Sequence, residues 1–130
     1  ANEGANKVIA VSTAGLQWLT PPPSGETTRE ARYGAVLSET DQPDYNEARA
    51  QWAAVNGQSP REVLGQIGGE PAWLQDEETP DCDSCGHPIP FVAQLEEGPD
   101  YRFEMNFGGG CAYVFRCGCH SASAKLLWQC

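Results

Sequence analysis

The cysteines place the strongest constraint on how this chain can fold. All six follow residue 81 of the 130-residue chain, and they form two tight groups. A disulfide framework that holds a small secreted domain is usually spread along the whole chain. Clustering therefore favours a local metal site. The first group is Cys82 and Cys85, and the second is Cys111, Cys117, Cys119 and Cys130.

Two pairs of these cysteines meet the requirements of a structural zinc ion. Zn²⁺ takes four tetrahedral ligands, and thiolate is a common ligand in structural sites. Cys82 and Cys85 can reach one ion because the chain between them folds into a tight knuckle, and Gly86 helps that turn. Cys117 and Cys119 add two thiols at the end of a predicted strand. We therefore predict a Zn²⁺ site formed by these four cysteines.

Other side chains near the two pairs receive different interpretations. Cys130 and His120 are reserve candidates for completing the metal site in place of Cys119. Cys111 lies across a strand from Cys117 by sequence count, so we interpret it as an ordinary buried small residue. His87 is interpreted as a loop histidine beside the knuckle rather than as a catalytic base.

The sequence leaves disulfides, redox-active thiols and free cysteines open as alternatives. A redox pair would favour a helix N-terminus, which lowers the pKa of the first thiol. Asp81 and Asp83 flank Cys82 and disfavour a thiolate there, and His87-Pro88 disfavours a helix beginning at this point. A catalytic zinc is also disfavoured, because four thiols would close the shell and leave no position for water.

Acidic residues dominate the charge of the chain. It carries 18 acidic and 8 basic residues, for a net charge of −10. Residues 70–104 alone hold 10 acidic residues against one basic residue, Arg102. Nucleic acids and anionic membranes attract basic surfaces, so this composition argues against both as ligands. It suits a basic protein or peptide, and the predicted partner-binding residues are Trp73, Asp76, Glu77 and Glu78.

The length suits one domain over residues 1–130. No apolar run approaches the roughly 20 residues that a membrane-spanning helix needs. The first residues lack the basic segment and long apolar run of a secretory signal. We therefore expect a cytoplasmic protein.

The clearest predicted helix covers residues 44–57. Asp44 can cap it, and Glu47 follows three residues later in a capping-box pattern. Ser59 and Pro60 then predict a short helical turn before a glycine-rich bend. The helix residues expected to share one face are Tyr45, Ala48, Trp52 and Val55.

Short apolar or alternating runs predict the strands. Residues 101–107 alternate between apolar and polar side chains, and a Gly-Gly-Gly turn at 108–110 should connect them to a returning strand, which would make 101–117 a hairpin. The fold class is therefore α+β, mostly antiparallel β in the C-terminal half, with one or two short helices and a zinc knuckle. The predicted strands are 7–11, 32–38, 90–95, 101–107, 111–117 and 125–129.

Several motifs occur in a recognisable order over residues 63–130. They are a Gly-Gly-x-Pro-x-Trp turn, a Cys-x-x-Cys, a glutamine-containing strand and an aromatic strand that ends in cysteine. In this combination the chain resembles the YwqG-like family of bacterial proteins of undetermined function. It is similar, more distantly, to the C-terminal domain of programmed cell death protein 2. The matching residues are Gly68, Gly69, Pro71, Trp73, Cys82, Cys85, Gln94, Tyr113, Phe115, Cys117, Trp128 and Gln129.

The resemblance implies a binding role, either as an immunity protein against a toxin or as a chaperone-like protein for a client. Our first hypothesis is therefore a non-catalytic, zinc-stabilised protein-binding module for a basic partner. The second is an enzyme, either a thiol oxidoreductase or a zinc enzyme that uses Cys82 and Cys85. The third is a structural subunit of a larger assembly.

Overall fold

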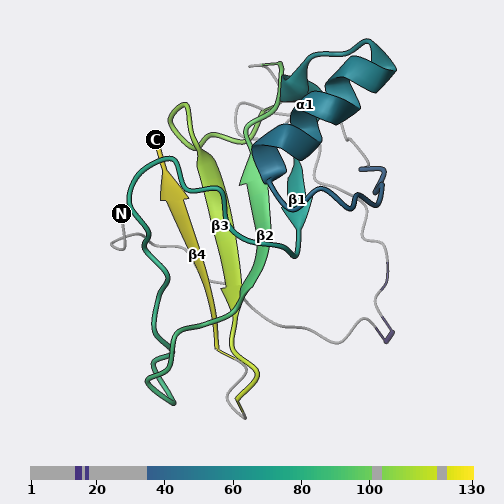
Figure 1. Ribbon diagram of the computed structural model, residues 1–130. Coiled ribbons are helices and arrows are strands. Elements are labelled where there is room, and N and C mark those ends of the chain that lie inside the picture. Colours follow the sequence, from purple (N-terminus) through teal and green to yellow (C-terminus); the bar gives the residue numbers. More distant parts are fainter. Residues whose placement is uncertain (1–13, 16, 18–34, 101–103, 120–122) are drawn as a thin grey trace.

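The computed structural model describes residues 14–15, 17, 35–100, 104–119 and 123–130, which form an antiparallel sheet with a helix at one side (Figure 1). The four strands are hydrogen-bonded in chain order, β1-β2-β3-β4. This arrangement confirms the predicted α+β class. No helix in the described parts of the chain is long and apolar enough to cross a membrane. The elements are α1 (Tyr45–Asn56), the 3-10 helix η1 (Pro60–Glu62), β1 (Gly65–Ile67), β2 (Phe91–Glu96), β3 (Cys111–Arg116) and β4 (Ala124–Gln129).

Helix α1 begins and ends where the sequence predicts. Asp44 is the N-cap, and its Oδ1 accepts a hydrogen bond from the Glu47 N–H at 2.8 Å. This bond satisfies one of the amides that the first turn leaves without a partner. Gly57 ends the helix with a left-handed φ of 63°. The predicted turn at Ser59 and Pro60 is also confirmed, as η1.

The buried face of α1 differs from the predicted one, most clearly at Val55. Val55 is 86% exposed, whereas Ala53 is buried. The side of the helix that turns inward carries Tyr45, Arg49 and Ala53, spaced four residues apart, so Val55 lies outside it. Arg49 fixes this orientation, because its guanidinium lies 5.5 Å from the Tyr45 ring centroid and 3.5 Å from a carboxylate oxygen of Glu96 in β2.

Strand β3 pairs with β2 and β4, so the predicted hairpin is wrong for residues 104–117, and residues 101–103 lie outside the described residues. Residues 104–107 contain no strand, since both edges of β3 are already occupied by its two neighbours. Backbone N–H groups of this loop are instead hydrogen-bonded within the loop. The Glu97 carboxylate accepts hydrogen bonds from the N–H groups of Phe107 and Gly109, the latter at 2.9 Å. The strands predicted at 90–95, 111–117 and 125–129 are confirmed as β2, β3 and β4 within a residue or two.

Strand β1 is an element that the sequence analysis missed. It has three residues and pairs antiparallel with β2. Gly65 has a φ of 139°, and a Cβ atom there would lie 1.9 Å from the backbone oxygen of Gln94. The close pairing thus requires a residue type that is normally depleted in strands. Of the remaining strand predictions, residues 35–38 form none, and 7–11 and 32–34 lie outside the described residues.

The 70–79 segment crosses one face of the sheet without joining it as a strand (Figure 1). Its backbone is held by side chains that rise from the sheet. The Ala72 N–H donates to a side-chain amide oxygen at 2.9 Å, and its carbonyl accepts from a tyrosine hydroxyl at 3.0 Å. The N–H groups of Leu74 and Gln75 share a second amide oxygen, each at 3.0 Å. Such bonds replace the partner strand that this backbone lacks. The three anchoring residues, in β2, β3 and β4, are Gln94, Tyr113 and Gln129.

The core lies between this segment and the sheet. Tyr113, Phe115 and Ile89 are fully buried there. The Trp73 ring lies above them, with its centroid 4.5 Å from that of Tyr113 and 6.0 Å from that of Phe115. Tilted and stacked aromatic pairs at these separations are favourable beyond the area they bury. The aromatic cluster therefore fixes the 70–79 segment against β3.

Candidate metal centre

The first cysteine pair lies on a tight hairpin. The Cys82 N–H donates to the His87 carbonyl at 2.8 Å, and the Gly86 N–H donates back to the Cys82 carbonyl at 2.8 Å. Gly86 has a left-handed φ of 69°, which a residue with a side chain rarely adopts. Next to this turn the hairpin is closed by a bridge between Asp81 and Pro88. The tight turn predicted around the two cysteines is therefore present.

The second pair lies where β3 turns toward β4. The Cys117 N–H donates to the Ser123 carbonyl at 2.7 Å, which continues the pairing of the two strands by one step. The Cys119 N–H points back to the Cys117 sulfur at 3.4 Å. A backbone amide directed at a sulfur stabilises the thiolate form. This second turn thus repeats the first in presenting two thiols on one side.

The four sulfur atoms converge on one point. The Cys82 and Cys119 sulfurs are 3.7 Å apart, as are those of Cys85 and Cys117. All four sulfurs lie within 4.8 Å of one another. Ligands at about 2.3 Å from a zinc ion in a tetrahedron are about 3.8 Å from each other. The cluster therefore has a geometry that can hold a metal ion, and it comprises the four cysteines that the sequence analysis selected.

The backbone around Cys82 favours its thiolate. The N–H groups of Cys85 and, second, Ser84 are directed at its sulfur and lower its pKa to about 6, although burial acts in the opposite direction. From the sequence, Asp83 was expected to disfavour this thiolate. In the structure the Asp83 carboxylate instead lies 2.7 Å from the ammonium group of Lys125 in β4. That ion pair offsets the negative charge beside the knuckle.

The pKa of Cys117 is shifted in the opposite direction to that of Cys82. The Cys119 N–H lowers the pKa of Cys117, but the neighbouring thiols and burial together raise it to about 12. One negative charge in the cluster thus opposes a second, because like charges this close cannot all ionise without compensation. A divalent cation at the centre would remove this opposition and deprotonate the remaining thiols.

The other residues considered at this site are placed elsewhere or not described. His120 lies outside the described residues. Cys130 is exposed at the chain end, where its carbonyl accepts a hydrogen bond from the Gln75 side chain at 2.7 Å. Cys111 is fully buried, as expected, and its thiol donates to the Tyr113 hydroxyl at 3.1 Å. The His87 side chain is exposed. None of the six cysteines, all of them among the described residues, is in a disulfide.

The residues predicted to contact a partner lie together on the 70–79 segment but differ in exposure. Trp73 is half-buried against the core, whereas Asp76 and Glu77 are exposed. Glu78 is half-buried, and one of its carboxylate oxygens accepts from the Gln129 side chain at 3.3 Å. The same amide donates to the Asp76 carbonyl at 2.9 Å. The acidic part of the segment is thus held in place by the sheet.

Gln94, Tyr113 and Gln129 carry part of the family resemblance, but their role as anchors was not predicted. The available signal was a glutamine directly after a run of apolar residues, once in β2 and once in β4. A buried side-chain amide must find hydrogen-bond partners. A glutamine at such a position therefore indicates a nearby backbone segment that is not hydrogen-bonded to a neighbouring strand. Both glutamines are buried, at 2% and 3% exposure.

Comparison with known proteins identifies one short match. A segment of 53 residues is 40% identical to the "Uncharacterized protein YpfL" of Salmonella typhimurium. The match covers 38% of this chain and 12% of that protein. No family model matches the chain, and no solved structure matches it.

Proposed function

We propose that the four-cysteine cluster binds a structural Zn²⁺ ion that fastens the C-terminal half of the fold. The observation that supports this most directly is the convergence of four sulfurs from two separate turns, with spacings near those of a tetrahedral zinc site. Four thiolates fill the coordination shell, so no position remains for a water molecule or a substrate. We therefore assign the ion a structural role and not a catalytic one.

The zinc proposal is tested by elemental analysis of the purified chain and of two cysteine variants. Cys117→Ser removes a proposed ligand, and Cys130→Ser changes an exposed cysteine outside the cluster. We expect one zinc per chain for the unaltered protein and for Cys130→Ser, and substantial loss for Cys117→Ser. Equal metal content in the two variants would exclude the four-thiol site.

The function that this scaffold serves is, in our proposal, the binding of a basic protein or peptide. The acidic residues of the 70–79 segment are held by the sheet instead of lying on a free loop, so they form a fixed negative surface. Such a surface speeds the encounter with a basic partner. The resemblance to YwqG-like proteins supports an immunity or chaperone-like role of this kind.

Salt dependence tests the binding proposal. The probe is a fluorescent nine-residue peptide of alternating arginine and glycine. We expect its association rate to fall steeply as ionic strength increases, because the Debye length shortens from about 10 Å at 0.1 M to about 3 Å at 1 M. Association that does not depend on ionic strength would remove the electrostatic argument.

A thiol oxidoreductase is the second candidate, and the lowered pKa of Cys82 is the observation that favours it. Against it, Cys82 is only 2% exposed, and its sulfur lies 3.7 Å from that of Cys119 in the other turn. Alkylation with iodoacetamide distinguishes the two. Rapid modification of native Cys82 at neutral pH favours redox chemistry, whereas protection until a chelator is added favours the metal site.

A further inference from the structure

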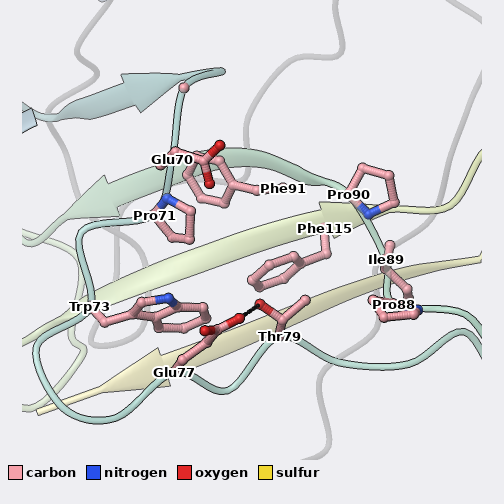
Figure 2. Close-up of a pocket in the computed structure, with 11 residues that line it drawn as sticks. Glu70, Pro71, Trp73, Glu77, Thr79, Pro88, Ile89, Pro90, Phe91 and Phe115 are labelled. Carbon is pink, nitrogen blue, oxygen red and sulfur yellow. Dashed lines mark hydrogen bonds between the residues drawn. The ribbon is translucent and has the colours of Figure 1, made fainter. Parts of the chain in front are cut away.

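A groove of about 610 Å³ opens between the 69–79 segment and residues 88–91 (Figure 2). Its volume is within the range of ligand sites in proteins. Six of its eleven lining residues carry an aromatic or proline ring. They are Trp73, Phe91 and Phe115, together with Pro71, Pro88 and Pro90.

The walls of this groove are held in shape from outside. One wall is the 70–79 segment, whose backbone is fixed by the side chains of Gln94 and Gln129. The other wall is residues 88–91, which follow the turn that carries Cys82 and Cys85. It is held by the Ile89 N–H, which donates to the Pro80 carbonyl at 2.8 Å. Prolines in both walls have no N–H and a fixed φ. The groove is therefore preformed and offers few backbone donors to a ligand.

Two carboxylates give the groove its charge. Glu70 lies on the side of Phe91, and Glu77 lies beside Trp73 (Figure 2). The Thr79 hydroxyl donates to Oε1 of Glu77 at 3.0 Å, which orients this carboxylate. A carboxylate has about four acceptor positions, so Glu77 can still accept from a ligand. The described residues that line the groove include no lysine, arginine or histidine.

This combination selects a particular kind of ligand. Aromatic faces attract cations, and carboxylates accept hydrogen bonds from them. A guanidinium group satisfies both requirements, because it is flat enough to stack on a ring and its N–H groups can reach a carboxylate in pairs. An ammonium group is a more strongly hydrated point charge and fits such a lining less well.

We propose that this groove binds the side chain of an arginine that projects from a basic partner, between the Trp73 ring and the carboxylates of Glu70 and Glu77. This inference rests on the proposed binding function and names its site. The arginine is the anchor, and the surrounding acidic residues of the 70–79 segment attract the rest of the basic segment.

The test uses nuclear magnetic resonance with two matched tripeptides. The ligand is acetyl-Gly-Arg-Gly-amide, and the control is acetyl-Gly-citrulline-Gly-amide, which has nearly the same shape and no charge. We expect the arginine peptide to shift the Trp73 indole N–H and the amides of residues 69–79 in a saturable way. The citrulline peptide should bind at least about ten-fold more weakly, since it lacks the charge-assisted hydrogen bonds.

Isosteric variants locate the site. Glu70→Gln and Glu77→Gln should each weaken binding of the arginine peptide by about three- to five-fold, as expected for charge pairs at exposed carboxylates. Glu62→Gln changes an exposed carboxylate of η1 outside the groove, so it should leave the affinity unchanged.

The outcomes separate the groove from the general binding function. If both tripeptides bind equally, or if the shifts lie outside residues 69–79 and 88–91, the groove proposal is wrong. Salt-sensitive binding of the arginine-glycine nonapeptide would then leave the proposed function standing. If neither the tripeptide nor the nonapeptide binds, both proposals fail.

Discussion

The Gln129→Met substitution measures how strongly the sheet holds the 70–79 segment. Gln129 is 3% exposed, and its side chain makes three hydrogen bonds to the backbone of this segment, at 2.9 to 3.0 Å. Methionine has nearly the same length, so the change removes the bonds with little change in packing volume.

The expected loss follows from these three bonds. A typical internal hydrogen bond contributes about 1 kcal/mol net, and a buried group left without a partner costs about 1–3 kcal/mol. The Leu74 N–H is also 3.0 Å from the Tyr113 hydroxyl and can keep that partner. We therefore expect a decrease of about 2–3 kcal/mol in the free energy of unfolding. That is a large share of the stability of a small domain.

Urea unfolding at a fixed zinc concentration provides the assay, with circular dichroism as the probe. Gln51→Met is the matched control, because Gln51 is an exposed residue of α1, and its effect should remain within about 0.5 kcal/mol. Hydrogen exchange supplies a second measurement, since the Gln75 amide should lose protection in Gln129→Met, whereas the Leu74 amide keeps the Tyr113 hydroxyl as a partner. A loss below about 1 kcal/mol with the Gln75 amide still protected would refute the anchoring role of Gln129.

Three further perturbations test separate parts of the structure. Gly65→Ala should destabilise the protein by more than about 2 kcal/mol in urea unfolding, because its Cβ would lie 1.9 Å from the Gln94 carbonyl oxygen. The control is Gly57→Ala, where no atom lies within 4 Å of the added Cβ. Equal effects of the two substitutions would contradict the observed pairing of β1. Asp83→Asn should reduce stability by less than about 1 kcal/mol and leave the zinc content unchanged, since the Asp83 side chain is 76% exposed. Loss of zinc from this variant would contradict this expectation and show that the Asp83–Lys125 ion pair holds the turn that carries Cys82 and Cys85. Burial raises the pKa of Tyr45 and Tyr113 well above its usual value near 10. These tyrosines therefore ionise more readily in the unfolded chain than in the folded one. The free energy of unfolding should fall as pH rises above about 10. Spectrophotometric titration at 295 nm should show a late-ionising component that Tyr113→Phe reduces, and an unchanged curve would count against that assignment.

The sequence alone determined those helices and strands whose start, end and pairing face are marked by residues close together in the chain. The capping pair Asp44 and Glu47 and the terminal Gly57 give α1 its bounds. The strand signals at 90–95, 111–117 and 125–129 correspond to β2, β3 and β4. Residues 101–107 have an equally regular alternation, but the described part of this run, 104–107, forms no strand, because pairing depends on which edge of β3 remains available. Sequence periodicity carries no information about that competition.

The sequence also selected the four cysteines of the candidate metal centre. The short spacing of Cys82 from Cys85, and of Cys117 from Cys119, restricts each pair to one turn of the chain, and thiol chemistry then limits what such pairs can do. Only the tertiary structure decided that the two turns meet, with the sulfurs within 4.8 Å of one another. It also decided that Gln94 and Gln129 serve the backbone of the 70–79 segment. The physical reason is that a ligand's chemistry and a turn's geometry are local properties, whereas the partner of a buried amide is set by the packing of segments distant in the chain.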